Sequence, residues 1–225
     1  MNKTTNIFLL LLSFPAMLLS IYIGFDMPIE FFKTTGQFVP FKEEVFLIFG
    51  ILNVLLIIRR SVKRWTGIKL VNATKKFKWN QPIAKERKTR VFMYLSLEIA
   101  VMTLMGLALL SICSDAWLIT AALFFGSADN LIFLLSGIRK NSYRIGITGQ
   151  ALVIADIEVK VLYFSGLREI SYQQESVFFD YRDDLQLSFA SSCIAKEEIE
   201  IFRNTLEEQV NRNKVFFSES FKKMN

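Results

Sequence analysis

The residues of this 225-residue chain whose types could do chemistry are two carboxylates within apolar segments. Glu98 lies eight residues after Arg90, and Asp129 lies ten residues before Arg139. In helices, which rise 1.5 Å per residue, these spacings place both acids in one layer of the bundle. This layer lies about 12–15 Å from the basic edge, the end of the apolar segments that Arg90 and Arg139 mark. Like charges disfavour double ionisation, so two neighbouring carboxylates would share a proton or hold a cation. The pattern therefore suggests a proton or cation site.

Two amides belong to the same layer. Asn53 lies about 9 Å from the same basic edge, and Asn130 directly follows Asp129. Ala122, Gly126 and Asn130 recur at every fourth position, a face that permits close helix approach. We expect the acids to face the bundle interior, with no basic residue in the spans to neutralise them. The alternative, which we favour, is that the four polar groups only hold helices together.

The composition argues against most enzyme chemistry. The chain has no His, which excludes Ser-His-Asp and Cys-His catalysis and His-ligated metal sites. Its two Cys are too few for a disulfide framework or a metal site of four thiolates. The sequence contains neither a Gly-rich phosphate loop nor a nucleophile–base pair. We therefore predict no enzyme, no cofactor and no metal.

Four apolar segments must position the polar groups. They cover residues of about 7–25, 41–58, 91–113 and 116–137, near the length of about 20 residues that crosses a bilayer. The first could instead be a signal peptide, but its apolar run is long and no clear A-x-A-like cleavage site follows. We favour an uncleaved helix. Residues 1–140 are therefore predicted to form an α-helical membrane bundle of four transmembrane helices.

The distribution of charge predicts the orientation. Residues 59–90 carry 12 basic residues and one acid, although the whole chain has a net charge of only +6. The positive-inside rule places this loop in the cytoplasm, and Arg139, Lys140 and Arg144 place the C-terminal region there too. We predict a multi-pass protein of the bacterial inner (cytoplasmic) membrane, with both termini in the cytoplasm.

The basic loop also has residues typical of a membrane surface. Apolar residues recur there at helical spacing among basic ones, as in a short interfacial helix, and Trp79 is expected at headgroup level. The residues predicted to contact lipid headgroups are Arg59, Arg60, Lys63, Arg64, Trp65, Lys75, Lys76, Lys78 and Trp79. The simpler alternative, which we favour, is that the loop only determines topology. Nucleic-acid binding is not expected, because a cytoplasmic loop between spans is basic in any case.

From about Asn141 the pattern changes to short β runs. They cover residues 143–148, 151–155, 159–164, 167–172, 177–181 and 185–189. A helix over 195–213 follows, with one apolar face, and Ser191 or Ser192 is placed to cap it. The last 11 residues are predicted to lie against the membrane through Phe216, Phe217 and Phe221, or to be disordered. Residues 141–225 thus predict a small α+β domain, a curled antiparallel sheet or partial barrel closed by a C-terminal helix.

This order resembles the bacterial pleckstrin-homology-like domains attached to membrane helices. The segments that carry the resemblance are YRIGITGQALVIAD, LREISYQQESVFFDY and KEEIEIFRNTLEEQV, in the last third of the chain. The resemblance implies a binding or assembly module rather than a catalyst. Such families commonly have two helices per domain, whereas this chain has four apolar segments. The 12 basic and 13 acidic residues from Ile138 onward give no support for phosphoinositide binding.

The sequence leaves three functions open. The preferred one is a non-enzymatic integral membrane protein whose cytoplasmic domain mediates protein interaction or self-assembly. The second is a small channel or transporter component that uses the intramembrane carboxylate pair. The third is an accessory or immunity protein against a membrane-acting toxin. The expected partners are the lipid bilayer and either another protein or further copies of the chain.

Overall fold

The computed structural model describes residues 2–29, 34–182, 184–210 and 215–224. It divides into two compact units. The helical unit comprises residues 1–63 and 94–134, and the β-rich unit comprises residues 64–93 and 135–225. This division differs from the predicted boundary near residue 140, because part of the basic segment belongs to the β-rich unit.

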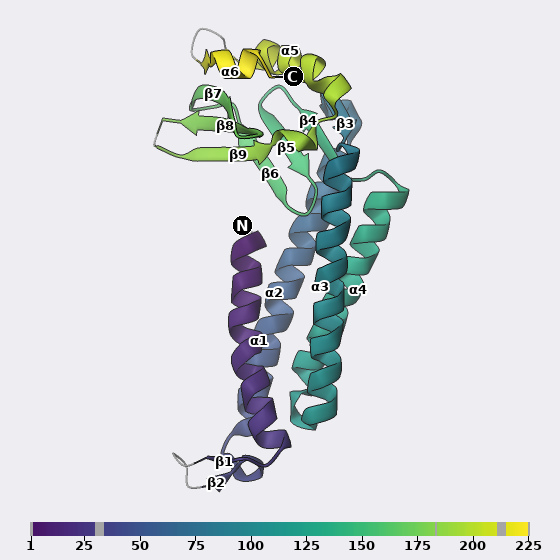
Figure 1. Ribbon diagram of the computed structural model, residues 1–225, viewed down its shortest axis with the longest axis vertical. Helices are drawn as coiled ribbons and strands as arrows, with labels where there is room; N and C mark the ends of the chain where they lie inside the picture. Colours follow the sequence, from purple (N-terminus) through teal and green to yellow (C-terminus); the bar gives the residue numbers. More distant parts are fainter. Residues whose placement is uncertain (1, 30–33, 183, 211–214, 225) are drawn as a thin grey trace. The chain divides into compact units, whose positions relative to one another are not determined.

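Four long helices run through the first part of the chain (Figure 1). They are α1 (Asn2–Gly24), α2 (Lys42–Val71), α3 (Lys85–Ile112) and α4 (Trp117–Arg139). Three stretches, Lys42–Val71, Lys85–Ile112 and Ser114–Arg139, are long and apolar enough to cross a membrane. In α1 the apolar helical stretch found among the described residues is the shorter Leu11–Gly24. A fourth crossing therefore stays a prediction.

The helices of the helical unit share one apolar core. Its buried residues include Ala16 of α1, Phe46 and Ile57 of α2, Leu109 of α3 and Ile119 of α4. Many large apolar side chains on the same helices point outward instead, such as Leu55 (58% exposed), Leu97 (66%), Leu104 (65%), Trp117 (62%) and Ile132 (59%). An apolar exterior of this kind is typical of helices that are solvated by lipid.

The basic segment is not a loop over most of its length. Helix α2 continues 13 residues beyond the predicted end of the second span, and α3 begins at Lys85. Arg and Lys are good helix formers, and the stretch before Val71 contains no Pro, so the helix has no local reason to stop at the end of the apolar run.

The β-rich unit contains two separate four-stranded sheets. The first has the order β3 (Trp79–Pro82), β4 (Arg144–Ile147), β5 (Ala151–Ala155) and β6 (Val159–Tyr163), all antiparallel. The second has the order β10 (Phe216–Phe217), β7 (Leu167–Gln173), β8 (Ser176–Tyr181) and β9 (Gln186–Ala190), with β10 parallel to β7. Two short strands, β1 (Pro28–Ile29) and β2 (Thr34–Thr35), form a hairpin before α2.

The six strands predicted after residue 141 are confirmed within a residue or two, but they do not form one curled sheet. The pair of β1 and β2 was missed, and so were two strands of the larger sheets, β3 and β10. Strand β10 comes from the final residues, where Phe217 and Phe221 are buried in the core of the domain, contrary to the predicted membrane contact or disorder. Both sheets contribute to this single core together with Phe202 and Leu206 of α5 (Ile199–Gln209).

Helix α5 begins later than predicted. A 3₁₀ turn over Lys196–Glu198 precedes it, and Glu198 occupies the N-cap position. Ser191 donates instead to the backbone carbonyl of Glu175 at 3.0 Å, so the predicted serine cap is wrong. A last short helix, α6 (Glu219–Lys222), is capped by Ser218, whose side chain accepts from the backbone N–H of Phe221.

Candidate functional site

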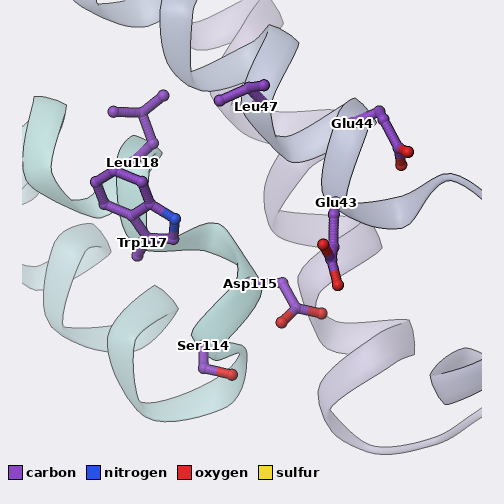
Figure 2. A pocket seen from close by; sticks show the side chains of 7 residues that line it. All are labelled: Glu43, Glu44, Leu47, Ser114, Asp115, Trp117 and Leu118. Atoms are coloured by element: carbon purple, nitrogen blue, oxygen red, sulfur yellow. The ribbon is translucent and has the colours of Figure 1, made fainter.

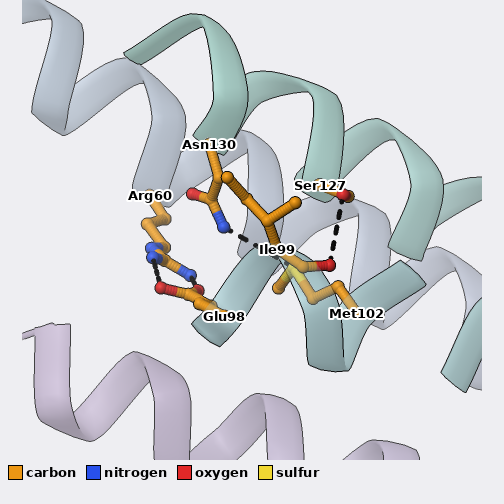
Figure 3. Close-up of polar contacts among 6 residues, drawn as sticks. All are labelled: Arg60, Glu98, Ile99, Met102, Ser127 and Asn130. Atoms are coloured by element: carbon orange, nitrogen blue, oxygen red, sulfur yellow. Dashed lines mark hydrogen bonds and ion pairs between the residues drawn. The ribbon is translucent and has the colours of Figure 1, made fainter. Parts of the chain in front are cut away.

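The predicted intramembrane carboxylate Glu98 is bound to an arginine (Figure 3). Arg60 of α2 donates from both terminal nitrogens to the two carboxylate oxygens of Glu98 on α3, and the bond from Nη2 to Oε2 measures 2.6 Å. The side chain of Arg60 is 3% exposed and that of Glu98 is 14% exposed. The expectation that no basic group neutralises the acids is therefore wrong for Glu98. The reason is that α2 continues past the apolar run and carries Arg60 against α3.

Asp129 of α4 is bound by a different residue of α2. Ser61, the residue after Arg60, donates from Oγ to Oδ1 of Asp129 at 2.8 Å. Neighbouring residues of a helix point about 100° apart, so α2 reaches α3 with Arg60 and α4 with Ser61. The two acids thus serve two helix contacts, and a proton shared between them is not needed to explain their presence.

The two predicted amides are buried and also join helices. Asn53 accepts from Ser13 Oγ at 3.3 Å and donates to the carbonyl of Phe49 at 2.9 Å. Asn130 donates to Met102 Sδ at 3.7 Å, from α4 to α3. These contacts are those expected of groups that hold a bundle together.

The stripe of small residues on α4 is confirmed as an inward face. Ala122, Gly126 and Asn130 are all buried, and a Cβ on Gly126 would lie 3.3 Å from both Ile57 and Met102. Next to this stripe, the hydroxyls of Ser127 and Thr103 lie 2.8 Å apart and link α4 to α3. The polar layer is therefore continuous with tight apolar packing.

An apolar cavity of about 430 Å³ borders Glu98. Its lining comes from α1, α3 and α4, and among the described residues that line it Glu98 is the one that carries a charge. Because Arg60 compensates this carboxylate, the cavity offers space for an apolar group rather than a path for a cation.

A second cavity, of about 410 Å³, lies where α2 begins (Figure 2). Glu43, Glu44 and Asp115 line it, and Asp115 pairs with Lys42 at 3.0 Å. Within the described residues no group of three or more Cys, Asp or Glu side chains could hold a metal ion. The lining combines these acidic side chains with the apolar Leu47, Trp117 and Leu118.

The residues predicted to contact lipid headgroups fall into two sets. Arg59, Lys63, Lys75, Lys76 and Lys78 are exposed, and Trp65 is half-buried. For these six, headgroup contact stays a prediction. Arg60, Arg64 and Trp79 are 3%, 2% and 7% exposed, respectively, which corrects the prediction for all three.

The case of Trp79 has a clear structural reason. It is the first residue of β3, which pairs with β4, so its side chain turns into the core of the domain. The indole lies 5.3 Å from the ring of Phe202 in an edge-to-face arrangement, and its N–H donates to Glu198 at 3.1 Å. A tryptophan among lysines resembles an interfacial anchor until the strand that contains it is known.

A groove of about 580 Å³ crosses the surface of the second sheet. Its lining residues are Arg168, Glu169, Asp180, Tyr181, Asp184, Leu185, Gln186 and Phe216. Phe216 of β10 lies opposite Glu169 of β7 and is 61% exposed, whereas the next residue, Phe217, is 8% exposed. Leu185, just before β9, is 52% exposed. The sequence analysis missed this groove, because the pairing of β10 with β7 joins segments 47 residues apart.

Burial also raises the pKa of two side chains in the β-rich unit. It raises the pKa of the Cys193 thiol from 9.0 to about 12, and the carboxylate of Asp156 contributes in the same direction. Burial likewise raises the pKa of the Tyr143 phenol. These shifts disfavour the charged forms, so neither group is a ready nucleophile or base.

Comparisons with models of protein families, with curated proteins and with solved structures found no match to this chain.

Proposed function

We propose that this chain is a non-enzymatic integral membrane protein whose β-rich unit binds a protein. In this proposal the bacterial inner membrane holds the helices, and the β-rich unit faces the cytoplasm. The three long apolar helices and their apolar exterior support a membrane location. Two sheets and a C-terminal helix around one core support the resemblance to pleckstrin-homology-like binding modules.

The observation that carries the proposal is the groove on the second sheet. Leu185 and Phe216 expose more than half of their surface in it. Exposed aromatic and aliphatic side chains within a hollow surface, surrounded by polar groups, are characteristic of protein interfaces, where a few apolar anchors provide most of the binding energy.

The charges around the groove indicate what the partner contributes. Three carboxylates, Glu169, Asp180 and Asp184, accompany one guanidinium, that of Arg168. Complementary charge at the rim orients partners and speeds their encounter. We therefore expect the partner surface to place basic residues around an apolar centre. An accessory or immunity role against a membrane-acting toxin would be one case of such binding.

A channel or transporter role has less support. It requires Glu98 and Asp129 to exchange a proton or cation, whereas Glu98 is bound by both terminal nitrogens of Arg60. Releasing this carboxylate would leave an uncompensated arginine in the bundle, which is costly.

Site-specific photo-crosslinking tests the proposal in native membranes. A photoreactive amino acid replaces Phe216 in the full chain, and the matched control carries it at Ile201 of α5, which is 51% exposed in the same unit. We expect a discrete adduct from position 216 that is absent from position 201. An adduct at twice the chain mass of 26.0 kDa would identify a second copy as the partner.

The apolar anchors provide the second measurement. Leu185→Ala and Phe216→Ala should each weaken binding of the crosslinked partner by about 2 kcal/mol if they are anchors, and Ile201→Ala should not. Equal adducts from both positions, or unchanged binding by both alanine variants, would contradict the proposal.

A further inference from the structure

Several cationic side chains gather in the β-rich unit where α3 and β4 begin. Lys85 and Lys88 come from the first two turns of α3, and Arg144 is the first residue of β4. The pairing of β3 with β4 sets Arg144 opposite Pro82, three residues before Lys85. The charges of Arg144 and Lys85 lie close enough to Lys88 to repel it electrostatically. The fold thus brings together three like charges from two distant segments.

These cations are positioned by neutral groups. Lys88 Nζ donates to Asn141 Oδ1 at 2.6 Å. Arg144 donates from Nε to Asn80 Oδ1 at 2.5 Å and from Nη2 to the backbone carbonyl of Asn80 at 3.1 Å. These neutral oxygens hold the side chains in position without neutralising their charge. The cluster therefore keeps a positive charge that an anion can neutralise.

A carboxylate of the same unit, that of Asp156, binds a different cation, Arg87. Arg87, next to Lys88, donates from Nη2 to Asp156 Oδ2 at 2.6 Å, and this carboxylate is 5% exposed. Among the described contacts of Lys88 and Arg144, the acceptors are amide and carbonyl oxygens. Arg87 is thus neutralised by a carboxylate, whereas the described acceptors of Lys88 and Arg144 are uncharged oxygens.

The cluster borders the apolar part of the helices directly. Lys85, Lys88 and Phe92 follow one another at positions i, i+3 and i+7, which share one face of α3. Phe92 is 47% exposed and Met93 is 64% exposed. At the end of α4, Arg139 and Lys140 follow Ile138, which is 49% exposed. A ligand with an anionic head and an apolar chain matches this sequence of surfaces.

We propose that Lys85, Lys88 and Arg144 bind the phosphate group of an anionic phospholipid, with an acyl chain along Phe92 and Met93. The inference rests on the proposed membrane location but not on the protein-binding groove. These residues differ from those that the sequence predicted for headgroup contact. The exposed Lys75, Lys76 and Lys78 provide general attraction to an anionic surface, whereas Lys88 and Arg144 are held in place by Asn141 and Asn80.

Lipid binding by the full chain in a mild non-ionic detergent tests the proposal. Native mass spectrometry follows the bound fraction as phosphatidylglycerol or phosphatidylcholine is added. We expect clear preference for phosphatidylglycerol. Each basic contact near a membrane surface is worth about a fivefold change in affinity, so Lys88→Gln should weaken binding about fivefold and Lys88→Gln/Arg144→Gln about thirtyfold. Arg144→Lys keeps the charge and should retain most of the binding.

The matched control is Lys196→Gln/Lys223→Gln, which removes two exposed lysines from the same unit. It should bind phosphatidylglycerol like the wild type, and thermal unfolding checks that every variant is folded. Equal binding by Lys88→Gln and the wild type would overturn the proposal, as would equal affinity for the two lipids. Displacement of the lipid by millimolar glycerol 3-phosphate alone would identify a free-phosphate site instead. Phe216→Ala should bind lipid normally, which separates this test from that of the proposed function.

Discussion

At the scale of single residues, the most informative contact is the ion pair of Arg60 and Glu98. Both residues were identified from the sequence, one as a headgroup contact and the other as a candidate proton site. The structure joins them through two hydrogen bonds. A polar group within a membrane bundle is stable when its partner is close, so the pair explains why a carboxylate can lie about 12 Å from the basic edge.

Breaking this pair should destabilise the protein. Arg60→Met leaves Glu98 without its cation, and the free energy of unfolding in detergent should fall by about 3 kcal/mol, the scale for losing one partner of a buried ion pair. Arg60→Met/Glu98→Leu removes both charges and should recover most of this loss. Lys69→Met is the control, because Lys69 is an exposed basic residue of the same helix. Wild-type stability of Arg60→Met would show that the pair does not stabilise the bundle.

The thiol of Cys193 gives a second test at this scale. Because the thiolate is the reactive form, a pKa raised to about 12 by burial predicts slow alkylation of the folded protein at pH 8. In a Cys113→Ala background, the rate should rise at least about a hundredfold in denaturant. Equal rates with and without denaturant would contradict the burial of this residue.

The same shift predicts how stability depends on pH. Folded Cys193 holds its proton up to about pH 12, whereas its ordinary pKa is 9.0. The folded state therefore binds more protons between these values, and the free energy of unfolding should fall as the pH rises from 9 to 12. Replacing Cys193 by Ala should reduce the slope, and denaturant titrations at several pH values measure it.

At the scale of elements, the extension of α2 organises much of the structure. The helix continues to Val71 and supplies Arg60 and Ser61 to the helical unit. Its final turns, in the β-rich unit, pack at Gly67, where an added Cβ would lie 1.9 Å from Val159 of β6. A glycine is needed there because the helix and the strand approach more closely than a side chain allows.

Gly67→Ala should therefore destabilise the β-rich unit. Overpacking a tight contact costs about 1–3 kcal/mol, and Val159→Ala in the same chain should recover part of it. Gly149→Ala is the control, because the closest atom to its added Cβ is Gln209 Oε1 at 3.8 Å. Thermal unfolding of the three variants measures the difference. The contact would be shown to be loose if Gly67→Ala and Gly149→Ala unfold at the same temperature.

At the scale of the whole molecule, the chain combines an apolar helical unit with a β-rich unit that has its own core. Each unit buries a separate set of apolar side chains, and most of the large apolar side chains that are exposed among the described residues belong to the helical unit. This difference in surface is what a protein needs when one part is solvated by lipid and the other by water.

The predicted orientation can be measured with single cysteines. In a Cys113→Ala/Cys193→Ala background, Gln37→Cys lies before α2 and Lys75→Cys lies after it, and both positions are exposed. A membrane-impermeant maleimide should label position 37 in intact spheroplasts and position 75 only after lysis. Labelling of both positions in intact spheroplasts would contradict a crossing by α2 in the proposed orientation.

The sequence by itself determined the elements whose signal is local. Apolar runs predicted four helices, of which three are long and apolar enough to cross a membrane, and alternation with turn residues predicted six strands, because these patterns repeat within each segment. The tertiary structure alone decided which distant segments meet. Trp79 looked like an interfacial anchor until β3 paired with β4, and Glu98 looked uncompensated until α2 continued as far as Arg60. Phe216 became part of a groove only through a strand formed after the last predicted helix. Such contacts depend on pairing and packing between remote residues, which no local pattern encodes.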